Sequence, residues 1–395
     1  MSSDVAFGRA RRLTARQRDG ESVSPLELFF DLVFVLGFTQ CTALMADEPT
    51  WEGLAKGLLV LGVLWWSWVG YAWLTSVVDP EDDAVRLVIF AAMAALLVVG
   101  LAVPGAFEDS ALIFACAYAF VRVMHIALFM LASREDAQLR ASVLGLAVST
   151  ALASGLLVGA SFADGALQGA LWALALGLDI GGPYLFGAQG WKLVPHHFSE
   201  RHGLIMIIAL GESIVAIGVG AEERIDAGIV VAAVVGTGIA AALWWLYFDV
   251  VALVAARRLV SAEAGRERNE MARDSYSILH LPMVAGIVLL SLGMKKTLGH
   301  VEDPLKLVPA TALLGGTAIY LLAHVAFRYR HIQTLNTRRL ALSILLVAFI
   351  PVAVEVAALV TITVLLAALV ALIAIETRAY GESRARTRAE LRQEH

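Results

Sequence analysis

Long apolar stretches alternate with short polar segments along almost the whole chain. Each stretch runs for roughly 17 to 25 residues, the length that an α-helix needs to cross about 30 Å of hydrocarbon. Short segments of strictly alternating polarity with regular turn signals are missing, which argues against a β-barrel. The pattern therefore predicts an all-α polytopic membrane protein with twelve spans, at residues 26–46, 53–77, 84–104, 110–132, 140–162, 166–187, 201–220, 227–256, 273–294, 306–327, 339–355 and 357–376.

Composition agrees with this pattern. Of the 395 residues, 59% are hydrophobic and 16% are charged, and the mean hydropathy is +0.75. Soluble globular domains carry roughly 25% charged residues. The chain is therefore predicted to be integral to a membrane, with lipids as its surroundings and partners.

The basic residues are divided unevenly between the two faces that twelve spans create. If the chain begins on the cytoplasmic side, the cytoplasmic segments hold 24 of the 30 Lys and Arg residues. Since positive residues concentrate in cytoplasmic loops, both termini are predicted to be cytoplasmic. Residues 1–24 lack an apolar core and a cleavage site, so no removable signal peptide is expected. The basic tail favours contact with anionic lipid, and no nucleic-acid partner is predicted.

Two parts of the chain resemble each other weakly. The Trp-rich segment 64–68 is echoed at 243–247, and residues 118–140 align without a gap on 317–339. An even number of spans per unit gives both units the same orientation, so the spacing predicts two parallel six-helix repeats. The alternative is a chance alignment of apolar residues. The predicted organisation is a basic N-terminal segment at 1–24, membrane units at 25–190 and 191–377, and a basic cytoplasmic tail at 378–395.

Charged and titratable side chains recur inside the predicted spans. Counting 1.5 Å per residue from the cytoplasmic ends places them about 8–15 Å below the inner surface. Six spans contribute to this layer, whose members are Asp31, Arg122, His125, Asp179, Glu212, Asp249 and His280. Ionisable groups at this depth are costly and commonly line a pathway. The layer predicts a polar chamber open to the cytoplasm, and the alternative is an ion-pair network that only orients helices.

Arg122 is expected to organise this layer by pairing with Asp31, Asp179, Asp249 or Glu212. One arginine cannot neutralise four acids, so the surplus carboxylates should be protonated or lie near water and cations. His125 follows Arg122 on the same helical face and is a candidate proton sensor, because histidine titrates near neutral pH. The alternative is a histidine that is only hydrogen-bonded to a carboxylate.

The first and seventh spans each present an unusual polar face. Glu27 lies one turn before Asp31, and Phe34 and Phe38 continue that face, which predicts a cavity wall or a gate. The alternative is that the two acids bind an arginine of a cytoplasmic loop. The triplet Glu200-Arg201-His202 opens the seventh span. It is predicted to mark the cytoplasmic mouth, either as a charged gate or as an interfacial anchor.

Soluble-enzyme motifs are missing from the sequence. It has no nucleophile elbow, Walker loop or dinucleotide fingerprint. Cys41 and Cys116 both fall within spans and have no metal-ligand spacing. We therefore predict no enzymatic activity, no cofactor and no metal site, with a membrane enzyme acting on lipid as an alternative. The sequence leaves open whether the chain forms a homo-oligomer.

Two segments resemble a known family. Residues 27–35, Glu-Leu-Phe-Phe-Asp-Leu-Val-Phe-Val, and residues 200–214, from Glu-Arg-His-Gly to Leu-Gly-Glu-Ser-Ile, are similar to the hallmark segments of the bacterial low-temperature-requirement A (LtrA) family. The resemblance covers most of the chain, and its two motifs fall in the first and seventh spans, as in that family. It implies a multi-span protein of the inner membrane, connected by name with growth in the cold and without a defined biochemical activity.

A more distant likeness concerns the lysosomal potassium channel family and its bacterial six-span relatives. Phe30-Asp31, followed by Val33-Phe34 and Thr39, is similar to the Phe-Ser-Asp signature of their first span. This chain has Phe30 in place of the serine, and its seventh span lacks the signature, which puts potassium selectivity in doubt.

Together the residues favour movement of a small cation, a proton or a small solute through the polar layer. In this hypothesis Asp31 and Glu212 bind the cation or proton, Arg122 organises their charges and His125 titrates beside them. The main alternative is a non-transporting membrane scaffold or stress-adaptation protein, in which the buried charges serve only assembly.

Overall fold

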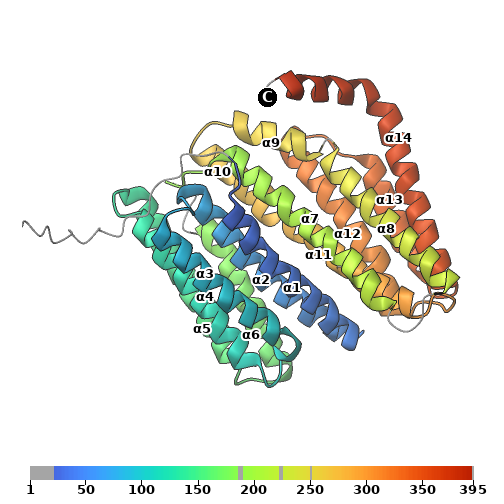
Figure 1. Ribbon diagram of the computed structural model, residues 1–395, viewed down its shortest axis with the longest axis horizontal. Helices are drawn as coiled ribbons and strands as arrows, with labels where there is room; N and C mark the ends of the chain where they lie inside the picture. The colour runs from blue at the N-terminus through green and yellow to red at the C-terminus, as the bar shows by residue number, and fades with distance from the viewer. Residues whose placement is uncertain (1–21, 186–189, 222–225, 250, 394–395) are drawn as a thin grey trace, which may run out of the picture.

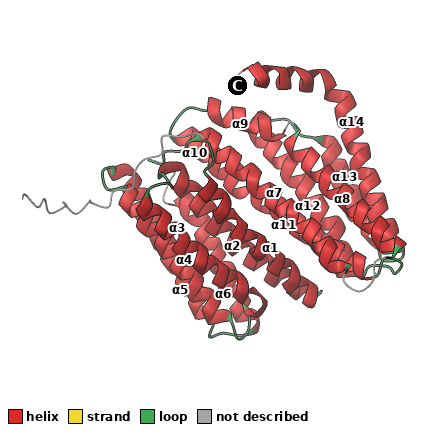
Figure 2. Cartoon of the chain, viewed as in Figure 1, coloured by secondary structure: helices red, strands yellow, loops and turns green. Residues whose placement is uncertain are grey.

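A computed structural model describes residues 22–185, 190–221, 226–249 and 251–393, with side chains described up to residue 379. Within this part the chain is helical and contains no strand (Figure 2). The described residues of all twelve predicted spans are largely helical, which confirms the all-α membrane fold. Most of the predicted basic N-terminal segment lies outside the described residues.

The first half of the chain folds into six long helices in chain order (Figure 1). They are α1 (Pro25–Asp47), α2 (Trp51–Val77), α3 (Asp83–Ala102) with the short 3-10 helix η1 (Val103–Gly105), α4 (Ala111–Ala132), α5 (Ala137–Ala160) and α6 (Gly165–Leu185).

The second half is less regular. It contains α7 (Pro195–Gly220), α8 (Ala227–Phe248), α9 (Val251–Ser261), α10 (Arg266–Met271), the π-helical segment η2 (Ala272–Ile278), α11 (His280–Gly299), α12 (Leu307–Ile332), α13 (Thr337–Ala353) and α14 (Ala358–Gln393). The predicted span 227–256 is thus divided between α8 and α9, and the span 273–294 begins inside η2. The tail predicted after residue 377 continues α14 as a helix, which bends and runs back above α9 at that end of the bundle (Figure 1).

In the part of the chain that the structure describes, ten helices are long and apolar enough to cross a membrane. The two remaining predicted spans are α6 and α13. The helix α13 has 17 residues, and α6 carries Gln168 and Asp179, both of which are buried against other helices.

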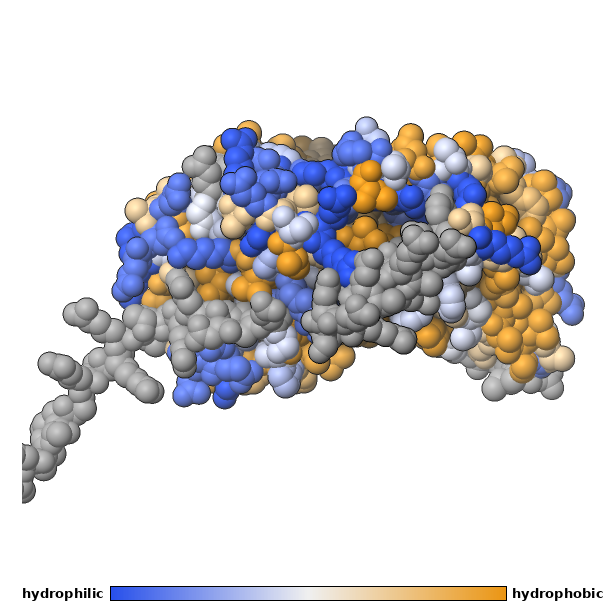
Figure 3. Space-filling model, turned by 90° about the horizontal axis from the view of Figure 1, so that it is seen from above, coloured by the Kyte–Doolittle hydropathy of each residue, from blue (hydrophilic) through white to orange (hydrophobic). Residues whose placement is uncertain are grey.

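The side chains of α1 show how the fold responds to lipid. Leu28, Phe29 and Leu32 are exposed, whereas Glu27 and Asp31 are buried. This distribution is the reverse of a soluble helix, and it is expected where the surroundings are hydrocarbon. Hydrophobic side chains likewise cover the flank of the bundle, and hydrophilic ones gather at the end where α9 and α10 lie (Figure 3).

Helices α2, α11 and α12 form the interior of the bundle, since 72–78% of their apolar windows are buried. The other candidate spans are 33–44% buried and face outward. The helices α11 and α12 approach closely because Gly286 and Gly316 face each other: a Cβ on Gly316 would lie 2.7 Å from the Gly286 carbonyl oxygen.

The predicted repeat finds no support in these burial values and stays a prediction. It pairs α2 with α8, yet 78% of the α2 window is buried against 39% for α8. The tryptophans behave in the same way: Trp65 and Trp66 are buried, whereas Trp244 and Trp245 are exposed.

Candidate functional site

A cluster of buried charged side chains lies between α1, α2 and α7. The Arg201 guanidinium donates one Nη1 hydrogen bond to Glu27 Oε1 at 3.0 Å and one Nη2 hydrogen bond to Asp31 Oδ1 at 2.6 Å. Trp68 Nε1 donates to the same Asp31 oxygen at 2.8 Å, and Thr75 Oγ1 accepts a third Arg201 hydrogen bond at 3.0 Å. These five side chains form what we call the inner network, and both acids and Arg201 are at most 1% exposed.

Local sequence explains why Glu27 lies here. Ser24 caps α1 in a capping box: its hydroxyl accepts from the Glu27 backbone N–H, and the Glu27 carboxylate accepts from the Ser24 backbone N–H at 2.9 Å. The other carboxylate oxygen faces Arg201 and His197 Nε2, the latter at 2.8 Å. Glu27 therefore joins the start of α1 to α7, and Asp31 follows one turn later on the same face.

Two buried atoms of the inner network, Arg201 Nε and one Asp31 carboxylate oxygen, have no hydrogen-bond partner among the described residues. The oxygen is Asp31 Oδ2. An ionised oxygen in this condition carries an unrelieved desolvation cost. It is the position in the network where a proton or a small cation would gain most.

A second carboxylate lies deeper on the same interface. Glu212 of α7 is 1% exposed and accepts a hydrogen bond from Thr39 Oγ1 of α1. Eleven residues separate it from Arg201, which is about 16 Å along the helix axis. Because Arg201 meets Asp31 and Glu212 meets Thr39, α1 and α7 run parallel. Asp31 and Glu212 therefore do not share one depth, in contrast to the predicted layer.

Two phenylalanines occupy the interval on α1. Phe34 and Phe38 are 2% and 0% exposed, and their ring centroids lie 6.5 Å apart. They continue the buried face that begins with Glu27 and Asp31. Along α1 these two phenylalanines thus lie between Asp31, which binds Arg201, and Thr39, which binds Glu212.

Arg122 belongs to a different cluster, in the first half. Its Nη2 donates to Asp179 Oδ1 at 3.0 Å and to Thr150 Oγ1 at 2.8 Å. Tyr118 donates to the other Asp179 oxygen at 2.7 Å. Arg122 therefore does pair with one of its four candidate acids, Asp179. It does not organise Asp31, because Arg201 occupies that role. The sequence interpretation placed Arg201 at the surface because it stands near the start of a span.

The triplet at the start of α7 does not lie at one location. Glu200 is exposed and accepts from the Val23 backbone N–H at 3.2 Å, whereas Arg201 and His202 are fully buried. Successive helical residues point about 100° apart, so neighbours in sequence face different surroundings. Only Glu200 lies where a cytoplasmic mouth was predicted.

His202 begins a row of buried rings in the second half. Its imidazole lies against the Trp68 ring at 4.8 Å between centroids and against His280 at 5.1 Å. His280 Nδ1 contacts the Ser275 carbonyl, which can only accept, so Nδ1 donates and Nε2 accepts from the Tyr247 hydroxyl at 2.8 Å. The predicted residue Asp249 caps the end of α8 two residues beyond Tyr247 and is 9% exposed.

A further buried ion pair lies in the second half, and it was not predicted from the sequence. Arg339 binds Glu376 with two hydrogen bonds, at 3.0 and 2.9 Å, and a further nitrogen contacts His324 Nδ1 at 2.6 Å. Asn336 donates to Glu376 at 2.7 Å. A signal was present, because Glu376 closes a long apolar stretch, and a carboxylate there requires a partner.

Comparison with known proteins places the chain in a family. Residues 22–374 match the model of the bacterial low temperature requirement A protein (LtrA) family. The chain belongs to the LtrA family. A relative described as "Uncharacterized protein RA0937", from Rhizobium meliloti (strain 1021), is 28% identical over 320 residues, which cover 78% of each chain. No solved structure matches the chain. The comparisons do not show the likeness to lysosomal potassium channels, which stays a prediction.

The segments that resemble the LtrA family lie at the α1–α7 interface. The two segments that carried the LtrA resemblance, 27–35 and 200–214, contain Glu27, Asp31, Arg201 and Glu212, which make polar contacts across the α1–α7 interface. Their further partners Thr39 and His197 lie outside these segments. In this LtrA protein the hallmark segments therefore pack against each other.

Proposed function

We propose that this multi-pass membrane protein moves a proton or a small cation, alone or together with a small solute, along the α1–α7 interface. The observation that carries the proposal is the pair of buried carboxylates, Asp31 and Glu212, at different depths on one interface. In this proposal the membrane is the bacterial inner membrane, and the end of the bundle that holds α9 and α10 faces the cytoplasm. The density of arginines in 257–273 supports this orientation.

Asp31 is the inner binding site in this proposal. Arg201 and Trp68 both bind Oδ1, while Oδ2 has no partner among the described residues. A proton or cation can therefore bind Oδ2 without first breaking the contact with Arg201. Arg201 also binds Glu27. A change of charge on Asp31 therefore changes how strongly Arg201 binds each of the two acids, and this shifts the preferred position of α7.

Glu212 is the deeper binding site. It has the Thr39 hydroxyl as a hydrogen-bond donor, and it forms no ion pair within the described residues. Phe34 and Phe38 lie between the two sites. Passage then requires their rings to move, because packed phenylalanines leave no polar atom to solvate an ion. The proposed pathway thus contains two carboxylate sites and a phenylalanine barrier between them.

Flux through proteoliposomes tests the proposal. The purified protein is reconstituted with an internal pH-sensitive dye, and proton flux is measured under an imposed potential with Na⁺ or K⁺ as the other cation. Asp31→Asn and Glu212→Gln remove the charge and keep the shape, so each should reduce flux at least tenfold. Ser213→Ala is the matched control, since Ser213 is buried beside Glu212 and bonds only its own helix at Leu210. Wild-type flux in both charge variants would refute the assigned roles.

The second candidate function is a structural scaffold, and a specific observation favours it. Three buried arginines each already contact an acid within 3.0 Å: Arg122 with Asp179, Arg201 with Asp31, and Arg339 with Glu376. Such pairs hold helices together without any transport. A scaffold predicts that Glu212→Gln lowers thermal stability and that reconstituted wild-type protein gives no flux above empty vesicles.

A further inference from the structure

A short amphipathic helix, α9, follows α8 in the chain and lies at the end of the bundle (Figure 1). It packs on α7 and α12. Ala255 and Leu259 are buried one turn apart on the same face, whereas Arg258 and Val260 are exposed. Amphipathic helices with basic residues lie in the membrane interface, with apolar side chains toward the acyl chains and basic ones among the headgroups. We therefore place α9 at the level of the lipid headgroups.

A shallow apolar groove lies between α9 and the last turns of α12. Val251 and Val254 of α9 and Phe327 and Ile332 of α12 form its apolar wall. Its volume is about 50 Å³, far below the roughly 300–1,000 Å³ of a pocket that encloses a small molecule. A groove of this size can hold a few methylene groups of a longer chain, while the rest of that chain stays in the bilayer.

Cationic side chains stand at the polar edge of this groove. Arg328 and His331 line it, and the charges of Arg258 and Arg330 act on His331, which places both arginines nearby. His331 is 8% exposed, and neither of its ring nitrogens has a hydrogen-bond partner among the described residues. A neutral imidazole carries one N–H, so His331 offers one unused donor in the wall.

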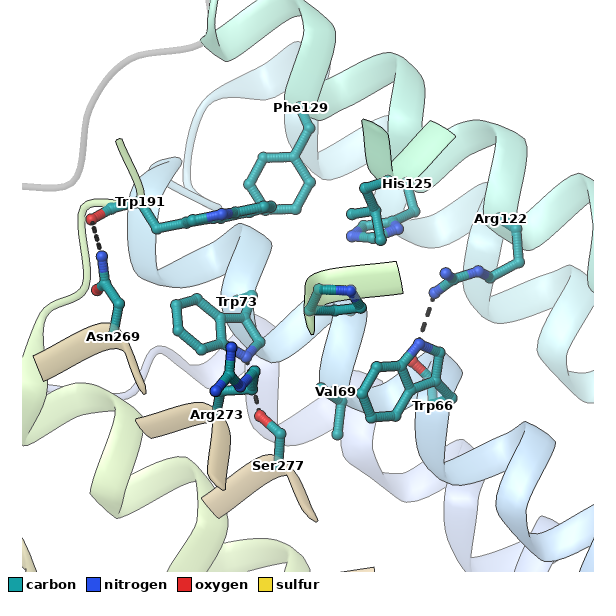
Figure 4. A pocket seen from close by; sticks show the side chains of 13 residues that line it. Trp66, Val69, Trp73, Arg122, His125, Phe129, Trp191, Asn269, Arg273 and Ser277 are labelled. Carbon is teal, nitrogen blue, oxygen red and sulfur yellow. Dashed lines mark hydrogen bonds between the residues drawn. The ribbon is translucent and has the colours of Figure 1, made fainter. Parts of the chain in front are cut away.

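Acidic residues do not balance these arginines. Residues 304–354 contain no Asp or Glu. Asp274 contacts Arg330 at 3.5 Å, but it also pairs at 2.8 Å with Arg273, whose side chain lines the cavity drawn in Figure 4. Arg258 is exposed and forms no ion pair with the described residues. An excess of positive charge therefore remains beside the groove, at the end of the bundle where hydrophilic side chains gather (Figure 3).

We propose that this groove binds an anionic phospholipid of the adjoining leaflet. Its phosphate lies among Arg258, Arg328 and His331, and the start of one acyl chain lies between Val254 and Phe327. Guanidinium groups bind phosphate oxygens through charge-assisted hydrogen bonds, and basic pockets between membrane helices bind anionic headgroups. An amine in the headgroup would add a positive charge beside the arginines, so the site favours phosphatidylglycerol over zwitterionic lipids. The groove lies outside the α1–α7 interface, so lipid binding does not depend on the proposed transport.

Binding of tritiated dioleoylphosphatidylglycerol to the full-length protein in maltoside micelles tests the site by a scintillation proximity assay. Saturable binding is expected, and unlabelled phosphatidylglycerol should compete at least tenfold more strongly than phosphatidylcholine with the same chains. Inorganic phosphate should not compete at the same concentrations, because it leaves the apolar wall uncovered. Equal competition by phosphatidylcholine, or a lack of saturable binding, would overturn the proposal. Competition by inorganic phosphate would replace the lipid with a soluble anion and overturn it as well.

Two exposed arginines at the same end of the bundle locate the bound headgroup. Arg258→Gln should weaken phosphatidylglycerol binding at least fivefold, whereas Arg258→Lys keeps the charge and should weaken it less. Arg266→Gln is the matched control, because Arg266 of α10 pairs with Glu270 at 2.8 Å and does not line the groove. It should bind within twofold of wild type. Equal losses in Arg258→Gln and Arg266→Gln would show attraction to the basic surface as a whole and contradict the assignment.

A second pair of variants tests the apolar wall. Val254→Asp places a carboxylate against the acyl chain and the phosphate, and it should remove saturable binding from protein whose helical circular dichroism is unchanged. Val260→Asp adds the same charge to the same helix at an exposed position that does not line the groove, and it should retain binding. Wild-type binding by Val254→Asp, or equal losses in the two variants, would refute the position assigned to the lipid.

Discussion

Arg201 is the most demanding test of the inner network, because a single guanidinium holds two buried acids. Nη1 reaches Glu27 and Nη2 reaches Asp31, at 3.0 and 2.6 Å. Arg201→Met keeps an unbranched apolar stem and removes every donor. Both carboxylates then stay in the interior without a cation.

Burial of the three charged groups determines how much stability Arg201→Met should lose. Removing one partner of a fully buried ion pair costs about 3–5 kcal/mol, and here Arg201, Glu27 and Asp31 are all at most 1% exposed. Asp31→Asn should cost less, about 1–3 kcal/mol, because the amide oxygen can still accept from Arg201 and Trp68. Arg201→Lys should fall between wild type and Arg201→Met, because a single ammonium lacks the fork that reaches both acids.

The free energy of unfolding is measured by titrating the protein in mixed micelles with SDS while following helical circular dichroism. In a double-mutant cycle, Arg201→Met and Asp31→Asn together should cost less than the sum of the two, with a coupling energy of roughly 2 kcal/mol. Arg86→Met is the control: Arg86 pairs with Glu81 at 2.8 Å on the half-exposed surface, and such a pair contributes about 1 kcal/mol or less. Additive costs for the two inner-network variants, or equal costs for Arg201→Met and Arg86→Met, would refute this reasoning.

Three further outcomes are expected. Gly316→Ala should destabilise the contact of α11 with α12, because its Cβ would meet the Gly286 carbonyl at 2.7 Å, whereas Gly315→Ala meets nothing closer than 3.6 Å and should unfold like wild type. Asp136→Ala should cost about 1 kcal/mol of stability at neutral pH, because Asp136 caps α5. The backbone N–H of Leu139 and nearby Lys192 lower the pKa of Asp136 below its ordinary 3.8. The stability that Asp136 contributes is therefore fully present above pH 3.8 and is lost as the pH falls below it, which unfolding curves at several pH values will show. Reporter proteins fused to each terminus should both be active in the cytoplasm, and a reporter active outside would reverse the proposed orientation.

The limits of the sequence interpretation are visible at particular helices. The spans were predictable because apolar length is a local property, and the described residues of each predicted span are largely helical. The separate helices α8 and α9 and the π-helical segment η2 were not predicted. Arg201 was placed at the surface because distance along the sequence from a helix end does not say which neighbour the side chain meets.

The sequence by itself determined that this chain is a helical membrane protein, and it located part of the charge in apolar surroundings, namely Asp31, Arg122, Asp179 and Glu212. A charge in hydrocarbon is costly wherever it occurs, so its presence inside a span can be read from a single segment. Tertiary structure alone decided the pairing: Arg201 with Glu27 and Asp31, Arg122 with Asp179, and Arg339 with Glu376. The partners stand up to 174 residues apart in the chain, and only the packing of whole helices brings them within hydrogen-bonding distance.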